Sequence, residues 1–227
     1  MNLQKPNSTV VLALGAPLID QVLLVPEEFV ENLPGEKGGS GMIDHETLQH
    51  LLDVCEIQPV IAAGGSTSNT VKGMAELGIK CAIVGKIGDD AHGKIYKDQM
   101  HKHGVYPLFH ESETPTGQVL CFVTPDGQRT MRSYLGASLE LEHHELHESN
   151  FEGIELFHLA SYSFYNQDLT KQSLDLAKEA GAKISLDLAS FEVVETFHEK
   201  LHYYLKHYVD IVFANEDEAR ALTGKSE

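Results

Sequence analysis

Two adjacent glycines, Gly64 and Gly65, stand between an apolar run and a segment of small polar side chains. The run before them predicts a strand, and the apolar positions after Ser66 recur with helical spacing, so the stretch is typical of a strand, a tight turn and a helix N-terminus. A glycine pair lets a ligand approach the main chain, and the first amides of a helix have no partner within it. With the Asn69 amide beside them, these groups could hold a polar, hydroxyl-rich molecule. The alternative is an ordinary strand-to-helix turn capped by Ser66 or Thr67.

An alternation of strands and helices has to position these groups. From residue 154 onward, apolar runs and helical patterns follow one another with short links, which predicts a parallel sheet with helices on both faces, in an α/β fold. The other expected strands cover 9–15, 22–25, 80–84, 105–109, 154–160, 183–188 and 209–213. The other expected helices cover 26–33, 45–55, 91–103, 140–148, 167–180, 191–206 and 216–222. Asp44 is the expected cap of the helix that starts at residue 45.

Two regions fit poorly inside such a sheet. Residues 116–124 and 128–134 are extended runs joined by a Pro-Asp-Gly turn, and Asp-Gly between such runs is a hairpin signal. The region 20–43 contains a glycine-rich stretch that is typical of a flexible, exposed segment. We therefore expect one α/β domain over 1–227, with lid segments at about 20–43 and 116–135 that form a small sheet on one side.

The overall composition limits the class of partner. The chain has 227 residues, 42% of them hydrophobic, and a formal net charge of −17. This charge argues against nucleic acid and anionic membranes as partners, although a local pocket can still attract an anionic substrate. Three cysteines, scattered singly in apolar segments, favour buried thiols and a cytoplasmic protein over a disulfide framework. The start of the chain has no signal-peptide pattern, and no apolar run is long enough to span a bilayer.

Two motifs that suggest other chemistry fail on their spacing. Gly224–Ser226 ends like a phosphate-binding P-loop, but the position five before Gly224 is Ala219 rather than glycine. The segment His143–His147 has one residue between its glutamate and the last histidine, whereas a zincin site needs two, so a solvated acidic helix explains it better. The thirteen histidines are mostly dispersed and define no catalytic triad.

Six short segments stand in an order that carries more information than any one of them. They are Gly15–Asp20, Gly64–Asn69, Gly85–Gly93, Pro115–Gly117, Gly127–Thr130 and Asn215–Glu218. Together, in this order, they resemble the PfkB family of carbohydrate kinases, also called the ribokinase-like family, which includes the adenosine kinases. The resemblance covers essentially the whole chain. The forms of the first two segments lean toward the nucleoside-kinase branch.

The resemblance implies a substrate site built on Asp20. In such kinases the matching aspartate accepts hydrogen bonds from sugar hydroxyls, and one carboxylate suits two vicinal hydroxyls because it has two acceptor oxygens. The positions that match Gly64, Gly65, Ser66 and Asn69 complete the sugar site. The implied substrate is a small-molecule sugar or nucleoside.

The resemblance also implies ATP and Mg²⁺ as cofactors. Asn215 and Glu218 match a motif near the ATP phosphates, where Glu218 would organise Mg²⁺ through water, which suits a cation that keeps several of its waters. Arg129 on the hairpin would reach the transferring phosphate, with a solvated strand arginine as the alternative. Asp187 follows a strand at its carboxyl end, where open α/β sheets bind ligands, and is a candidate nucleotide contact.

Two departures from the family pattern bear on activity. Ala16 stands where nucleoside kinases usually have asparagine, which removes one hydrogen bond to the substrate and leaves a sugar or another nucleoside open. Nothing after Asn215 matches the family's Gly-Ala-Gly-Asp segment, which supplies oxyanion-binding amides and the general base. We therefore expect the chain to lack the C-terminal part of the family fold, with the catalytic base beyond residue 227.

These observations support one interpretation and leave two alternatives. The first is an ATP-dependent kinase that phosphorylates a hydroxymethyl group of a sugar or nucleoside, although the 227-residue chain itself would be inactive. The second is a fragment or diverged paralogue that binds the sugar without turnover. The third is a non-enzymatic partner subunit. The resemblance suggests that the lid closes over the substrate and often pairs with a second subunit, so a homodimer through the lid is one option.

Overall fold

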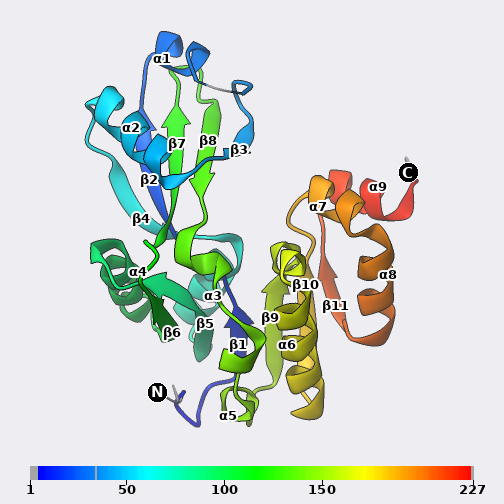
Figure 1. The fold of residues 1–227 in the computed structure, drawn as a ribbon. Coiled ribbons are helices and arrows are strands. Elements are labelled where there is room, and N and C mark those ends of the chain that lie inside the picture. Colours follow the sequence, from blue (N-terminus) through cyan, green and yellow to red (C-terminus); the bar gives the residue numbers. More distant parts are fainter. Residues whose placement is uncertain (1–4, 34, 226–227) are drawn as a thin grey trace.

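The fold contains two β-sheets and their flanking helices (Figure 1). The computed structural model describes residues 5–33 and 35–225, so Ser226 of the Gly-Lys-Ser segment lies outside the described residues. The first sheet contains β1 (Val11–Leu14), β5 (Cys81–Gly88), β6 (Val105–Ser112), β9 (Leu156–Ala160), β10 (Lys183–Asp187) and β11 (Ile211–Phe213). The second contains β2 (Leu18–Leu24), β3 (Ser40–Met42), β4 (Val60–Gly64), β7 (Gly117–Val123) and β8 (Arg129–Tyr134).

Helices connect most of these strands. The α-helices are α1 (Glu27–Glu31), α2 (His45–Cys55), α3 (Ser66–Glu76), α4 (Ala91–Lys102), α5 (Glu148–Phe151), α6 (Gln167–Glu179), α7 (Phe191–Thr196), α8 (His198–His207) and α9 (Glu216–Thr223). The 3-10 helices are η1 (Gly136–Leu139), η2 (His143–Glu145) and η3 (Ser161–Tyr165). None of the helices in the described part of the chain is both long and apolar enough to cross a membrane.

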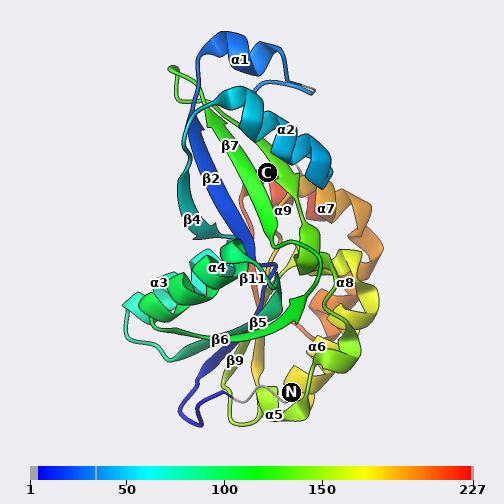
Figure 2. The same ribbon diagram turned by 60° about the vertical axis from the view of Figure 1, so that its left-hand side comes forward.

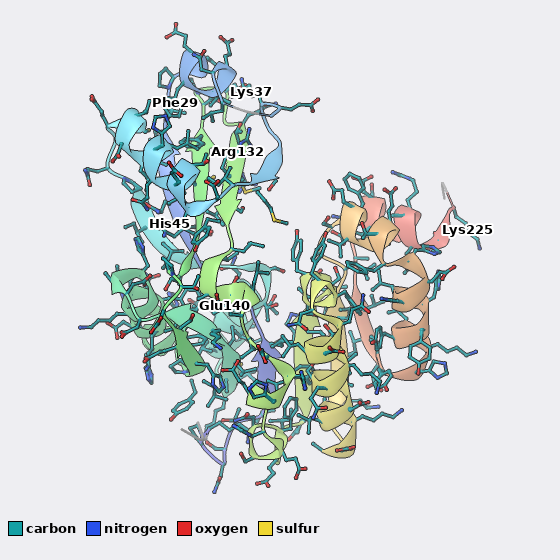
Figure 3. The ribbon with its side chains drawn as sticks, in the orientation of Figure 1. Phe29, Lys37, His45, Arg132, Glu140 and Lys225 are labelled. Atoms are coloured by element: carbon teal, nitrogen blue, oxygen red, sulfur yellow. The ribbon has the colours of Figure 1, made fainter. Side chains whose placement is uncertain are left out.

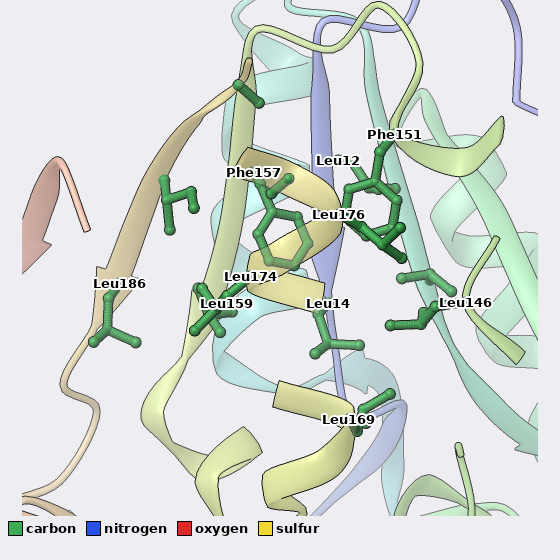
Figure 4. Packing of buried hydrophobic residues seen from close by; sticks show 14 of the residues in the cluster. Leu12, Leu14, Leu146, Phe151, Phe157, Leu159, Leu169, Leu174, Leu176 and Leu186 are labelled. Carbon is green, nitrogen blue, oxygen red and sulfur yellow. The ribbon is translucent and has the colours of Figure 1, made fainter. Parts of the chain in front are cut away.

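The first sheet is entirely parallel, in the order β11-β10-β9-β1-β5-β6. Side chains of β1, β9 and β10 pack on one face against α5, α6, α7 and α8, in a cluster that includes Leu14, Phe157 and Leu174 (Figure 4). On the other face, α3 and α4 contribute Val71 and Tyr96 to a second cluster. The expected α/β class, a mainly parallel sheet with helices on both faces, is confirmed.

The second sheet has the order β3-β8-β7-β2-β4 and stands beside the first (Figure 1). A third apolar cluster lies between one face of this sheet and the helices α1 and α2 (Figure 2), where Leu48 packs with Leu120 and Phe122. Helix α2 begins where its capping residue predicted, because the Asp44 carboxylate accepts a hydrogen bond from the Thr47 N–H at 2.8 Å. The second sheet therefore has a hydrophobic core of its own.

The segments 20–43 and 116–135 supply four of the five strands of this second sheet, which lies outside the parallel one. The fifth strand, β4, was not expected there. It pairs antiparallel with β2, with Ala62 opposite Asp20, so the strand before the glycine pair belongs to the projecting sheet. The function of this sheet as a lid stays a prediction.

Two of the expected helices were wrong. Residues 140–148 form no single helix and contain only η2 and the first residue of α5. Leu141 and Leu146 are both buried in the same cluster, but residues five apart lie about 140° apart around a helix, so one helix could not bury both. The helix expected over 191–206 is interrupted at Phe197, which separates α7 from α8 and turns its ring onto the aromatic side chains of η3.

Asp90 joins the second sheet to the first. Its Oδ1 accepts hydrogen bonds from the Gly93 N–H and the Thr116 hydroxyl, both at 2.7 Å, and its Oδ2 accepts from the Thr116 N–H at 2.8 Å. The Gly88 N–H donates to the Thr116 hydroxyl oxygen at 2.9 Å. Burial by itself would raise the pKa of Asp90, but the hydrogen bonds from Gly93 and Thr116 outweigh it and hold the pKa below its ordinary value.

Glu140 makes a second connection at the same place (Figure 3). Its carboxylate accepts hydrogen bonds from the hydroxyls of Ser112 and Thr114, and its carbonyl accepts one from Lys86 Nζ at 3.1 Å. Ser112 and Thr114 precede the β7–β8 hairpin in the chain and Glu140 follows it. These bonds therefore tie the two ends of the hairpin together.

We expect Thr116→Val to lower the free energy of unfolding by about 1–3 kcal/mol, because it removes the hydroxyl that donates to Asp90 Oδ1 and accepts from the buried Gly88 N–H. Urea unfolding followed by circular dichroism measures this. Thr196→Val is the matched control, since it makes the same chemical change on an exposed helical residue. Equal losses from the two variants would contradict the role given to Thr116.

Candidate functional site

The candidate site lies where β4, a strand of the second sheet, leads into α3, a helix that packs against the first sheet. Gly65 is the residue before α3, has a φ of +94° and provides no side-chain cap, so the first amides of the helix have no partner within it. A Cβ on Gly65 would lie 2.8 Å from the carbonyl oxygen of Ala16, which leaves glycine as the residue that fits. The alternative of a turn capped by Ser66 or Thr67 is wrong.

Asp20 leans over the other glycine of the pair. A Cβ on Gly64 would lie 2.2 Å from Asp20 Oδ2, so the carboxylate occupies the space that any side chain at residue 64 would need. Asp20 is half-buried, and this burial raises the pKa of its carboxyl, while the charge of Lys72 acts in the opposite direction. The structure thus brings Asp20 and the glycine pair together, as the resemblance implied.

Two buried side chains, Ser68 and Tyr96, form hydrogen bonds that connect to the glycine pair. The hydroxyls of Ser68 and Tyr96 are hydrogen-bonded to each other, and the Tyr96 hydroxyl also donates to the Gly64 carbonyl at 3.3 Å. Both side chains are fully buried. This support could not be predicted from the sequence, because nothing in the spacing of Ser68 and Tyr96 links the first turn of α3 to the middle of α4.

Asn69 and Ser66 lie on the first turn of α3 and have different surroundings. Asn69 is exposed, its backbone N–H donates to the Gly65 carbonyl at 2.9 Å, and its side chain makes no hydrogen bond to another described residue. Its side-chain amide is therefore available to a ligand. The Ser66 hydroxyl instead donates to Asp187 Oδ2 at 2.9 Å, which links the carboxyl end of β10 to α3.

Asp187 begins a tight turn between β10 and α7. Its Oδ1 accepts a hydrogen bond from the Ala189 N–H at 3.1 Å, and Ala189 has a φ of +61°, which is unfavourable for a residue with a Cβ. Such strained turns are common at functional sites, and this one lies at the sheet edge where ligands bind in open α/β folds. Through the hydrogen bond from Ser66, Asp187 is thus connected to the first turn of α3. The position of Asp187 in the sequence did not predict this contact.

Asn215 and Glu218 form a reciprocal cap at the start of α9. The Asn215 side chain accepts a hydrogen bond from the Glu218 N–H at 2.9 Å, and the two Glu218 oxygens accept from the Asn215 N–H and side-chain amide at 3.0 and 2.9 Å. Glu218 is only 5% exposed. Its engaged carboxylate fits contact with Mg²⁺ through water rather than direct coordination. Within the described residues, no three His, Cys, Asp or Glu side chains group so that they could hold a metal ion.

Arg129 is separated from these groups. It is exposed and is the first residue of β8, opposite Val123 at the end of the hairpin next to the turn. Tyr134, at the other end of β8, lies about 17 Å along the strand. Arg129 is therefore at the distal end of the second sheet, away from the start of α3 (Figure 1).

Tyr162 is a further candidate site residue that was not predicted from the sequence. It is the second residue after β9, lies in η3, and is 47% exposed. Partial burial raises the pKa of its hydroxyl, and the carboxylates of Asp187 and Glu218 are close enough to raise it further. An aromatic residue two positions after a parallel strand was the available signal. Tyr162 adds an open aromatic face to the carboxyl edge of the sheet.

Together these residues can hold a polyhydroxylated molecule. A partly buried carboxylate supplies two acceptors, a free amide supplies a donor and an acceptor, and the open helix start supplies N–H donors. An aromatic face at the same sheet edge can stack on a flat ring.

Comparisons with known proteins identify the family of the chain. Residues 39–227 match the family described as pfkB family carbohydrate kinase. Fructokinase-1 of Oryza sativa is 30% identical over 175 residues, which are 73% of this chain and 54% of that protein. The guanosine-inosine kinase of Escherichia coli K12 is 24% identical over 239 residues, which are 96% of this chain and 53% of that protein. The chain thus spans about half the length of these two relatives.

Solved structures show the same fold. The adenosine kinase of Sinorhizobium meliloti superimposes with a TM-score of 0.86 and 27% identity, over 97% of this chain and 69% of that one. A probable sugar kinase of Rhizobium etli superimposes with a TM-score of 0.87 and 26% identity, over 100% of this chain and 69% of that one. The architecture of two sheets is therefore shared with kinases of sugars and of adenosine.

We expect Asp20→Asn to raise the melting temperature of the ligand-free protein at pH 7 by roughly 1–3 °C. Because burial raises the pKa of Asp20 in the folded state, the folded protein holds this proton more tightly than the unfolded chain does, and stability falls as the pH rises through that range. The gain should shrink as the pH falls through about 4, because the unfolded chain then also takes up the proton. Scanning calorimetry from pH 3.5 to 8 measures it, with Asp98→Asn on the exposed side of α4 as control. A lower melting temperature for Asp20→Asn at pH 7 would contradict this account.

Proposed function

The chain belongs to the PfkB family of carbohydrate kinases, and on that basis we propose that it binds a sugar or nucleoside for ATP-dependent phosphorylation of a hydroxymethyl group. One observation carries the proposal: the Asp20 carboxylate lies over the glycine pair, at the start of α3, with the exposed Asn69 amide on the same turn. This is a site for adjacent hydroxyls, which ribose and simple sugars share.

The aromatic ring of Tyr162 favours a nucleoside over a simple sugar. It is exposed at the carboxyl edge of the sheet and lies close to Asp187, which in turn bonds Ser66 of the hydroxyl-binding group. A base attached to a sugar held at Asp20 has a flat face that can stack on this ring, whereas a simple sugar lacks one. Ala16 replaces the asparagine that nucleoside kinases usually have at this position, so the identity of the base stays open.

Phosphoryl transfer places further demands on the site. The acceptor hydroxyl must be positioned, its proton accepted, and the charge of the transferring group stabilised by donors. Mg²⁺ bound with ATP supplies part of that charge stabilisation. In our proposal Asp20 and Asn69 hold and orient the sugar, and Asn215 and Glu218 keep the start of α9 in place beside the phosphates.

The second sheet is proposed to act as a lid. Its face opposite α2 carries large exposed apolar side chains, among them Leu24 at 71%, Met42 at 71% and Val60 at 70% exposed. Apolar surface of this kind usually covers a ligand or a partner protein. Closure over the sugar would exclude water and suppress transfer of phosphate to it, and pairing of two such faces would give a homodimer.

We expect Asp20→Asn and Asn69→Ala each to weaken binding of the preferred sugar or nucleoside roughly ten- to hundred-fold, because each removes a hydrogen bond in a partly desolvated site. Titration calorimetry with a panel of sugars and nucleosides measures this, and circular dichroism checks that both variants fold. Asp98→Asn is again the control. Unchanged affinity in both variants would remove Asp20 and Asn69 from the site.

We also expect residues 1–227 by themselves to bind without turnover. Asp187 and Glu218 are engaged by Ser66 and Asn215, and Asp20 holds hydroxyls, so none of the three is placed to accept the proton. Absence of a positioned base lowers a rate by about 10²–10⁴. A coupled ADP assay with Mg-ATP and the same panel measures turnover, with the S. meliloti adenosine kinase run in parallel. Turnover comparable to that enzyme's would show that the base lies within these residues.

A further inference from the structure

Two helical side chains hold the outer edge of β4. This strand is the last of the second sheet and pairs with β2 alone, so its other edge carries backbone groups without a strand partner. At Ala63 both groups are engaged: the N–H donates to Gln99 Oε1 and the carbonyl accepts from Lys72 Nζ, each at 2.6 Å. Gln99 comes from α4 and Lys72 from α3, so Ala63 is anchored to both helices of the main body.

This anchor lies next to the residues that bind hydroxyls in our proposal. Ala63 precedes Gly64, over which the Asp20 carboxylate lies, and Ala62 is the register partner of Asp20. A shift of β4 along or away from β2 would therefore move the Asp20 carboxylate relative to the start of α3. The hydrogen bond from Lys72 to the Ala63 carbonyl opposes such a shift, one residue before Gly64.

Lys72 is also the cation that acts on Asp20. It is half-buried, and burial lowers the pKa of its ammonium group, while the charges of Asp20 and Glu76 raise it. Two other titratable groups lie near Asp20, Tyr96 of α4 and Cys121 of β7, and burial raises the pKa of both, so both stay neutral at pH 7. Lys72 is therefore the positive charge that opposes the cost of burying the Asp20 carboxylate.

We propose that Lys72 is a positioning residue for the substrate site: it fixes β4 through the Ala63 carbonyl and places a positive charge near the Asp20 carboxylate. The proposal rests on the proposed function only in taking Asp20 as the acceptor of substrate hydroxyls. Lys72 acts through Asp20 and β4, not through a contact of its own with the sugar.

The test measures the ionisation of Asp20 with no ligand present. Carbon-13 NMR of the side-chain carboxyl, assigned by its loss in Asp20→Asn, follows its titration in the unmodified chain and in Lys72→Met, Lys72→Gln and Lys72→Arg. We expect the midpoint of Asp20 to move to higher pH in the Met and Gln variants and to return in the Arg variant, which keeps the charge and a donor for Ala63. Lys80→Met removes the same charge beyond the far end of α3 and should leave the midpoint unchanged.

Affinity for the best ligand of the panel gives the second readout. We expect Lys72→Met to weaken binding roughly ten-fold at pH 7 and to steepen its loss toward acid pH, with Lys72→Arg close to the unmodified chain. If Lys72→Met fails to fold, the measurement uses Lys72→Gln instead, because glutamine retains an N–H donor for the Ala63 carbonyl. If no sugar or nucleoside binds the unmodified chain, the proposed function fails while the titration still decides the role of Lys72. A midpoint that is the same in Lys72→Met, Lys72→Gln and Lys80→Met would overturn the inference.

Discussion

The carboxylate of Asp20 can lie over residue 64 only because that residue has no Cβ. The space is filled completely, since a methyl group there would overlap both carboxylate oxygens. From this one contact follow the approach of β2 to β4, the half-burial of Asp20 and the direction in which β4 enters α3. The position of Asp20 over the glycine pair therefore depends first on a steric condition, the absence of a side chain at residue 64, and only then on hydrogen bonds.

The same contact has an electrostatic cost. Burying a carboxylate in the absence of its ligand disfavours its charged form, which is the form that accepts two hydroxyl hydrogen bonds. A neighbouring ammonium group offsets this cost without occupying the acceptor oxygens, as Lys72 does from the far edge of β4. A charged carboxylate in the free site therefore costs stability, and in our proposal a bound sugar would replace the water contacts that burial removes.

Much of the fold could be predicted from the sequence because its signals are local. The Asp44 cap, the strand-glycine-helix order around Gly64 and the hairpin turn each depend on neighbours within a few residues. What could not be predicted depends on residues far apart in the chain: the pairing of β4 with β2, and the bond from Ser66 to Asp187. The helix expected over 140–148 failed for the same reason, since its two leucines face a core built by distant strands.

The strand order also determines when the two neighbours of β1 become available during synthesis. β1 lies in the middle of the parallel sheet, with Val11 opposite Cys81 on one side and Leu156 on the other. At about 5–20 residues per second, a ribosome needs roughly 7–30 s after making β1 to reach β9. Through that interval one edge of a buried, wholly apolar strand has no partner, while the β7–β8 hairpin can close as soon as it emerges. All five strands of the projecting sheet are therefore synthesised before the central strand of the parallel sheet has both of its neighbours.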